Sequence, residues 1–328
     1  MSDRQARKQA VTQADVARHA GVSGAVVSYV VHGGPRPVAA ETALRVRASI
    51  EALGYRPNAS AAALRTGSSK LLGLVVPDIG NTLWADLTVA AGRCAADRGY
   101  DLITASSEGS ATIERQHLQS LAGRQVEGLL VTVVDMVDPD VAGITGTGIP
   151  TVLLNVFSDA PGVSSIGVDA RRGAADGVTH LLGHGYRDVG LIIHPDETVE
   201  LREQGWEQAL GSRGPIERGP STRQGGYEAA LRLFGRPDRP RSVFVSSDMQ
   251  AIGCLRALWE LGLRVPEDVA VVSFDGAADS AFTTPPLTVV RQPVGLMARQ
   301  AVDLVLDGGP ARRIVEPATL TVRKSCGC

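Results

Sequence analysis

The 328-residue chain has few aromatic residues, few cysteines and no long apolar run: aromatics make up 4% of it, and there are four cysteines. Four cysteines are too few to build a disulfide framework at this size. No segment approaches the ~18 uninterrupted apolar residues of a membrane span. The first residues, Met-Ser-Asp-Arg-Gln-Ala-Arg-Lys, lack the apolar stretch of a signal peptide. We therefore expect a soluble, cytoplasmic protein that does not contact a membrane.

Motifs of the common enzyme classes are also missing. The glycine-rich segment that begins at Gly183 precedes a strand-like run instead of following one, so it fails as a dinucleotide fingerprint. There is no P-loop, and Ser246-Ser247-Asp248 lacks the frame of a nucleophile elbow. The six histidines do not show metal-ligand spacing, and Cys326-Gly-Cys328 supplies too few ligands for a zinc ion. We expect no catalytic residues, no cofactor and no metal. A frayed tail is the preferred interpretation of the two C-terminal cysteines, and a metal or redox role is the alternative.

Charge is distributed unevenly along the chain. Net charge is −2 overall, but residues 1–70 carry +6 and the remainder carries −8. A basic first fifth on an acidic body is typical of a nucleic-acid-binding headpiece, although a solvated basic terminus gives the same pattern. The length suits two or three domains.

The basic segment has the pattern of short helices. Thr12-Gln-Ala-Asp15 resembles a capping box, Gly21 ends a first helix, and Ser23 can cap a second that runs to Val31. Apolar residues at helical spacing predict a third helix over 40–53. Two helices joined by a three-residue turn that contains glycine are the signature of a helix-turn-helix. A small three-helix bundle without DNA affinity is the alternative.

The pattern changes at Leu71, where short apolar strands begin to alternate with helix-length segments. This alternation predicts parallel sheets, and two series of strands predict two doubly wound subdomains with a ligand site between them. Val168-Asp169 is taken as the start of the second series. The other expected strands are Leu71–Val76, Leu102–Ala105, Leu129–Val133, Thr151–Leu154, Val189–Ile193, Val243–Val245 and Val269–Phe274.

Motifs spread over residues 12–325 resemble the lactose-repressor (LacI/GalR) family and occur in that family's order. In the basic segment they are Asp15-Val-Ala, Ala20-Gly-Val-Ser23, Val27-Ser28 and Leu53-Gly-Tyr-Arg-Pro-Asn58. In the rest of the chain they are Gly73-Leu-Val-Val-Pro-Asp78, Asn81-Thr-Leu-Trp84, Val168-Asp169, Gly183-His-Gly-Tyr186, Ser247-Asp248, Gly262–Val269, Phe274-Asp275 and Pro286–Pro293.

The resemblance implies an all-α helix-turn-helix headpiece and an α/β core like that of periplasmic sugar-binding proteins. It implies a headpiece over 1–57, a hinge helix and linker over 58–69, and a core over 70–328. The N-subdomain would span about 70–166 and 292–320, and the C-subdomain about 167–291 and 321–328. The chain would cross between them near Gly167, Arg291 and Thr321.

The resemblance also implies a homodimer on a pseudo-palindromic operator, with the helix after Ser23 in the major groove. Gly24, Ala25 and Tyr29 occupy its base-reading positions, and neither Gly24 nor Ala25 can make a bidentate base contact. Val26 and His32 replace a common Thr and Asn, and Ala39 leaves the third helix without a side-chain cap. The full set of expected DNA-binding residues is Thr12, Ser23, Gly24, Ala25, Val26, Ser28, Tyr29, His32, Arg36, Thr42, Tyr55, Asn58, Ala61 and Leu64.

The Ala-rich segment Asn58–Arg65 would be marginal as an isolated helix. In the family such a segment folds on operator DNA, and its leucine inserts between bases in the minor groove. Leu64 matches that leucine, and Ala61 matches the small residue that lets two hinge helices approach. Packing on a short linker helix is the alternative role for Leu64.

Pocket positions of the family fall on eight residues. Asp275 and Arg202 can each engage two adjacent sugar hydroxyls, and Trp84 can stack on a sugar ring. The alternatives are an Arg202–Asp275 ion pair and core packing of Trp84, and we expect Asp248 to cap a helix. The expected effector-binding residues are Leu83, Trp84, Asn155, Phe157, Arg202, Ser221, Ser247 and Asp275.

Together these patterns predict a transcriptional repressor whose operator affinity depends on a small effector, with a sugar preferred and a nucleobase or nucleoside second. The effector can act as inducer or corepressor by changing the spacing of the two hinges. The alternatives are a free sugar-binding protein and an enzyme on a Rossmann-like fold.

Overall fold

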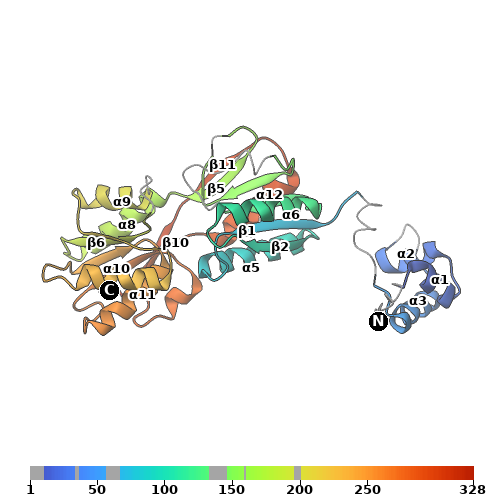
Figure 1. Ribbon diagram of the computed structural model, residues 1–328, viewed down its shortest axis with the longest axis horizontal. Helices are drawn as coiled ribbons and strands as arrows, with labels where there is room; N and C mark the ends of the chain where they lie inside the picture. Colours follow the sequence, from blue (N-terminus) through green and yellow to red (C-terminus); the bar gives the residue numbers. More distant parts are fainter. Residues whose placement is uncertain (1–10, 34–36, 57–66, 133–145, 159, 196–200) are drawn as a thin grey trace, which may run out of the picture. The chain divides into compact units, whose positions relative to one another are not determined.

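The computed structural model describes residues 11–33, 37–56, 67–132, 146–158, 160–195 and 201–328. The chain divides into two compact units, residues 1–69 and 70–328. Each is described by itself (Figure 1). No helix in the described ranges is long and apolar enough to cross a membrane.

The smaller unit is a three-helix arrangement of α1 (Gln13–Ala20), α2 (Gly24–His32) and α3 (Ala40–Leu53). The Thr12–Asp15 capping box forms, and Gly21 ends α1 in the left-handed conformation with a φ of 65°. The Ser23 side chain caps α2 by accepting a hydrogen bond from the Val26 amide. Helix α3 has no side-chain cap, as Ala39 predicts. A small apolar core of Val16, Ala17, Ala20, Val27 and Val46 joins the helices.

The first sheet of the larger unit is parallel throughout, with strand order β11-β5-β4-β3-β1-β2. Side chains alternate between its faces. Leu72 and Leu74 pack in the cluster that includes α5 (Thr82–Asp97) and α12 (Val294–Asp307), whereas Val75 packs with α6 (Ala111–Gly123). The strands are β1 (Leu71–Val76), β2 (Asp101–Ser106), β3 (Gly128–Val131), β4 (Thr151–Leu154), β5 (Ser164–Val168) and β11 (Arg313–Glu316).

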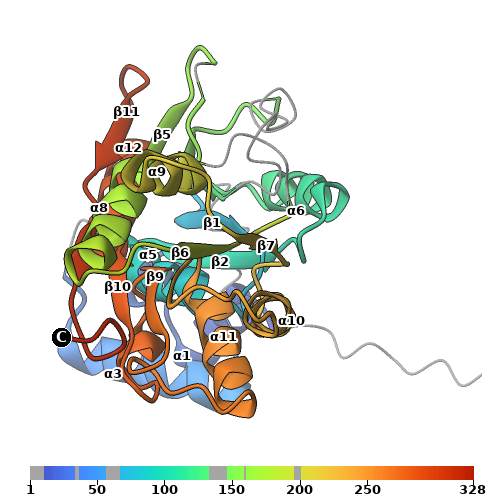
Figure 2. The same ribbon diagram turned by 90° about the vertical axis from the view of Figure 1, so that its left-hand side faces the viewer.

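The second sheet has strand order β12-β10-β9-β8-β6-β7 and is parallel except for its edge strand β12. Helices α8 (Ala170–Gly183) and α9 (Leu201–Leu210) cover one face, and α10 (Arg223–Phe234) and α11 (Asp248–Glu260) cover the other (Figures 1 and 2). Its strands are β6 (Val189–Ile193), β7 (Ile216–Arg218), β8 (Ser242–Val245), β9 (Ala270–Asp275), β10 (Thr288–Arg291) and β12 (Thr319–Thr321). Both halves of the core are thus doubly wound, as the strand pattern predicts.

Two details of the sheets differ from the sequence prediction. Strand β5, which ends at Val168, pairs with β4 and β11, so it belongs to the first sheet and does not begin the second series. Strand β12 pairs with β10, so the last passage between sheets precedes Thr319 and is earlier than the expected Thr321. Both errors arise because the local sequence of a short strand does not identify its sheet, and only the pairing partner decides.

The C-terminus is packed against the second sheet, so the prediction of a frayed tail is wrong. Ser325 and Cys326 are fully buried. The Ser325 hydroxyl donates to the Val271 carbonyl over 2.6 Å and accepts from the Thr288 amide over 2.8 Å. Of the other two cysteines, Cys254 is buried and Cys94 is partly buried.

Candidate DNA interface and effector site

The start of α2 presents small residues to solvent. Ser23, Gly24 and Ala25 are exposed, and so is His32 at the other end of the helix. A Cβ atom built on Gly24 would meet nothing within 4 Å. The first turn of α2 therefore combines the backbone amides of a helix N-terminus with a smooth surface, which suits close approach to a groove or phosphate.

Several other predicted DNA-binding residues are only partly accessible. Val26 and Tyr55 pack against the apolar core of the headpiece, while Ser28, Tyr29 and Thr42 are half-buried. The side chain of Thr12 donates to Asp15 over 2.7 Å within the capping box. Arg36, Asn58, Ala61 and Leu64 lie outside the described residues.

Gln13, which sequence reasoning missed, holds the start of α2. Its side-chain amide donates to the carbonyl of Gly24 over 2.7 Å. This bond connects the first helix to the turn that would face DNA. A glutamine at the first position of a helix is too common for its partner to be predicted from the sequence.

The eight predicted effector residues share one placement: each lies at or after the carboxyl end of a strand. In the first sheet, Leu83 and Trp84 follow β1, and Asn155 and Phe157 follow β4. In the second sheet, Arg202 follows β6, Ser221 follows β7, Ser247 follows β8, and Asp275 ends β9. This edge is where doubly wound sheets bind ligands. Leu83 is buried, and Trp84 is half-buried against the core.

Asn155 has two features typical of a ligand contact. Its φ is +58°, in the left-handed region that non-glycine residues rarely adopt. Its side-chain oxygen Oδ1 is buried and has no hydrogen-bond partner among the described residues. Gln292, just after β10, likewise has a buried Oε1 without a described partner. A buried polar atom without a partner costs about 1–3 kcal/mol, which a ligand donor can recover.

Asp275 is fixed in place at the end of β9. It is 3% exposed, and its φ is +113°. Its Oδ1 accepts a hydrogen bond of 2.8 Å from the Gln292 side-chain amide. Arg202 donates from Nη1 to the Ser246 carbonyl over 2.8 Å, and its guanidinium lies 5.5 Å from the centre of the Phe274 ring.

Asp248 does not cap its helix, so that prediction is wrong. Ser247 caps α11 instead, because its hydroxyl accepts from the Gln250 amide. The Asp248 carboxylate accepts from the Ser273 hydroxyl over 2.6 Å and from the Ala277 amide over 2.7 Å. Burial, together with the negative charge of Asp275, raises the pKa of Asp248 to about 7.

One group of metal-ligating side chains forms within the described residues, and it corrects the interpretation of the histidines. His180, His184, Cys326 and Cys328 place their ligand atoms within 4.8 Å of one another. The spacing of the two histidines is compatible with a metal site, because residues four apart lie on one helix face.

The fold and site define a class of protein: a helix-turn-helix unit joined to an α/β core with ligand-type residues at its strand ends. Residues 12–58 match the model of bacterial regulatory proteins of the lacI family, and residues 178–326 match that of a periplasmic binding protein-like domain. The chain is 35% identical over 322 residues to the HTH-type transcriptional regulator reg1 of Streptomyces lividans, with 91% of each chain covered.

Comparison with solved structures gives the same result. The lac repressor dimer bound to operator and an anti-inducer superposes with a TM-score of 0.83 and 27% identity, covering 97% of this chain and 99% of that one. A CelR–cellobiose complex matches with a TM-score of 0.70 and 28% identity, covering 96% and 99%. The chain belongs to the lacI family of bacterial regulatory proteins, and it is a DNA-binding transcriptional regulator.

Proposed function

We propose that this protein is a repressor whose affinity for a pseudo-palindromic operator is set by a small effector, preferably a sugar, bound between the two halves of its core. One observation carries the proposal. A single chain combines an exposed helix-turn-helix with ligand-type residues at the strand ends of both sheets. The headpiece covers about residues 1–57, the hinge 58–69 and the core 70–328.

The DNA-reading part of the proposal depends on shape more than on bidentate base contacts. Gly24 and Ala25 are exposed where base-reading side chains are expected, and neither has hydrogen-bonding groups in its side chain. Ala25 can contact a thymine methyl group, and Tyr29 can donate through its hydroxyl. Backbone amides at the start of α2, with Ser23, would contact phosphates. Leu64 would supply the minor-groove wedge.

The effector part depends on buried polar atoms. A sugar hydroxyl can donate to Asn155 Oδ1 or to Gln292 Oε1, both buried without described partners. Asp275 and Arg202 are the charged groups proposed to engage further hydroxyls, and Trp84 is proposed to pack against the apolar face of the ring. The relative solved with cellobiose supports a sugar.

Exposed apolar side chains support the proposed homodimer. Phe282 is 87% exposed and Val89 is 53% exposed. They belong to neighbouring segments, because the Ala278 amide donates to Asp86 of α5 over 3.2 Å. Contiguous exposed apolar patches are typical of interfaces between protein subunits, and Phe282 and Val89 are proposed to belong to one such patch. A lac repressor dimer on operator is the structural precedent.

The proposal includes no catalytic step, and it places the protein in the cytoplasm, where the operator DNA lies. The relative from Streptomyces lividans and the two solved structures carry the names of regulators, not of enzymes. A free sugar-binding protein remains the alternative, and the helix-turn-helix unit is the feature that argues against it.

The DNA-binding test is a gel-shift assay of the full chain with palindromic fragments from upstream of its own gene, at several salt concentrations. We expect specific binding that weakens as salt rises, because phosphate contacts release counterions. Leu64→Ala should weaken specific binding much more than nonspecific binding. Leu44→Ala, which changes a 63% exposed leucine on α3, is the matched control and should change neither. Equal losses of both kinds of binding in Leu64→Ala would contradict the wedge, and the absence of any preferred palindrome would contradict the repressor function.

The effector test is a thermal-shift screen of the full chain against sugars and, as a second group, nucleosides. A ligand that binds only the folded state raises its apparent stability. We expect a sugar to give the largest shift, and we expect Asn155→Ala to weaken that response. A response to nucleosides alone would exclude the sugar. Repeating the gel shift with the ligand then shows whether it acts as inducer or corepressor.

A further inference from the structure

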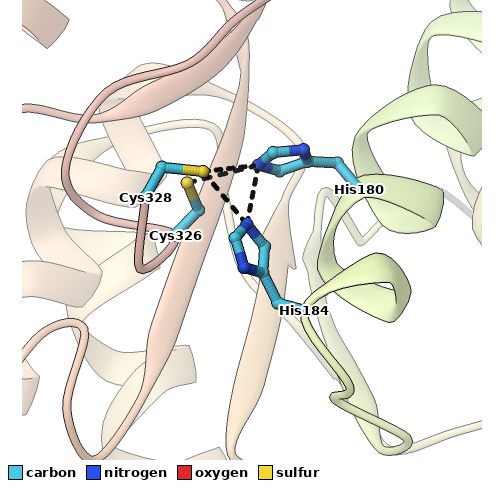
Figure 3. Close-up of side chains that lie close together, drawn as sticks. All are labelled: His180, His184, Cys326 and Cys328. Atoms are coloured by element: carbon cyan, nitrogen blue, oxygen red, sulfur yellow. Dashed lines mark hydrogen bonds between the residues drawn. The ribbon is translucent and has the colours of Figure 1, made fainter.

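Four side chains from two distant parts of the chain meet at one point (Figure 3). His180 lies in the last turn of α8, and His184 is the residue that ends that helix. Cys326 and Cys328 lie near the C-terminus, more than 140 residues later in the chain. None of the four belongs to the proposed DNA or effector site.

The local backbone structure directs the two histidines and the two cysteines towards one another. Residues four apart on a helix lie on the same face, so His180 and His184 present their rings side by side. The two cysteines flank Gly327, which has a φ of +99°. That conformation favours glycine, and it lets the chain turn so that both sulfur atoms point to the histidines (Figure 3).

The distances between ligand atoms suit a tetrahedral ion. The two Nε2 atoms are 3.3 Å apart. His180 Nε2 lies 3.3 Å from Cys326 Sγ and 3.7 Å from Cys328 Sγ, and His184 Nε2 lies 3.1 Å from Cys328 Sγ. With bonds of about 2.3 Å to sulfur and about 2.0–2.1 Å to nitrogen, tetrahedral coordination separates its ligand atoms by roughly 3.3–3.8 Å. The side chains are therefore close to the arrangement that a metal ion would require.

Contacts from neighbouring residues hold the Cys326 side chain in place on one side of the cluster. Cys326 is fully buried, and the Thr288 hydroxyl donates to its sulfur over 3.1 Å. The Thr288 hydroxyl itself accepts from the Arg323 amide over 2.8 Å, which orients its proton towards the sulfur. Such outer contacts orient ligands and are typical of built metal sites. Cys326 and Cys328 are both free thiols, not a disulfide.

We propose that His180, His184, Cys326 and Cys328 form a structural Zn²⁺ site. Two thiolates and two imidazoles in a tetrahedral arrangement are a donor set that selects zinc over magnesium or calcium, which prefer oxygen ligands. Four protein ligands leave no open position, so the site is structural and not catalytic.

The ion would fasten the end of the chain to α8 across the second half of the core. The segment after β12 already bonds to the sheet through Ser325. Zinc would add a crosslink between elements far apart in sequence, and metal that binds only the folded state stabilises it.

The first test measures metal in the full chain purified from zinc-supplemented cells in chelator-free buffer. We expect about one zinc ion per chain, and we expect a chelator to lower the apparent melting temperature. Metal-free protein reloaded with Co²⁺ should show the visible absorption of tetrahedral cobalt together with thiolate-to-cobalt charge transfer. A chain that purifies without zinc and binds neither added Zn²⁺ nor Co²⁺ overturns the proposal, as does a Cys326–Cys328 disulfide in freshly purified, folded protein.

Variants separate this site from adventitious binding. Cys328→Ser and His184→Gln change exposed side chains and should leave the circular dichroism spectrum unchanged while reducing the bound zinc. Cys94→Ser, which changes a partly buried cysteine on α5, is the matched control and should retain it. Thr288→Val should weaken zinc affinity by roughly 10–100-fold through the lost contact to Cys326. Zinc retained in both ligand variants, or lost equally in Cys94→Ser, would contradict the assignment.

Discussion

Replacing Asp248 by asparagine should change how stability depends on pH. The buried Asp248 carboxyl has its pKa raised to about 7 from its ordinary value of 3.8, through burial and the neighbouring Asp275. The folded state therefore binds the proton more tightly than the unfolded state does. The stability from this proton is fully present below about pH 4 and is lost as pH rises through about 7.

The size of the effect follows from the shift. Each pKa unit corresponds to about 1.4 kcal/mol, so a shift of about three units changes the free energy of unfolding by on the order of 4 kcal/mol between about pH 4 and pH 7. The amide introduced by Asp248→Asn has no such titration but could keep both contacts, accepting from the Ala277 amide and donating to the Ser273 hydroxyl. We expect Asp248→Asn to gain stability relative to the parent chain as pH rises from 5 to 7.5.

The assay is urea unfolding of the parent and variant at pH steps between 5 and 7.5, followed by tryptophan fluorescence. Trp206, buried in the second half of the core, contributes to this signal together with Trp84 and Trp259. Asp238→Asn changes an exposed carboxyl group and should give a difference that does not vary with pH. Asp275→Asn should move the pH range over which this stability is lost to lower pH, because it removes a negative charge that raises the pKa of Asp248. A constant difference between the parent and Asp248→Asn across this range would refute the reasoning.

Three further predictions concern the headpiece, the core packing and the assembly. Gly24→Gln should fold normally, because a Cβ there meets nothing within 4 Å, and it should change operator preference in a binding-site selection; an unchanged preference would exclude base contacts from this position. Gly253→Ala should lower the free energy of unfolding by about 1–3 kcal/mol in urea titrations, because the new Cβ atom would overlap the Arg223 carbonyl where α10 and α11 meet. Gly295→Ala, with open space around the new Cβ atom, should not lower it. Equal effects of the two variants would contradict the packing argument. Phe282→Asp should shift the protein towards monomer in light scattering, and an unchanged mass would place the interface elsewhere.

Much of the fold could be predicted because its signals are local. The capping box at Thr12, the cap at Ser23 and the left-handed ends at Gly21 and Gly54 depend on neighbours in the sequence, and all of them form. Buried parallel strands such as Leu71–Val76 and Val189–Ile193 appear as apolar runs for the same reason. The placement of the effector candidates at strand ends follows from the alternation of strands and helices.

What the sequence left undetermined depends on partners far along the chain. The sequence predicts that Asp248 caps its own helix, but its carboxylate bonds to Ser273 and Ala277 on another segment. Strands β5 and β12 belong to one sheet or the other according to the strands they pair with, which no local pattern reveals.

The C-terminal cysteines show most clearly the difference between what the sequence determines and what the tertiary structure decides. The sequence by itself determined a helix-turn-helix headpiece, a doubly wound core and the family resemblance, because these rest on local periodicity and on motif order. Taken alone, Cys326 and Cys328 offered too few ligands for a metal. Only the tertiary structure brought them to His180 and His184, because the second sheet places the chain end against the last turn of α8.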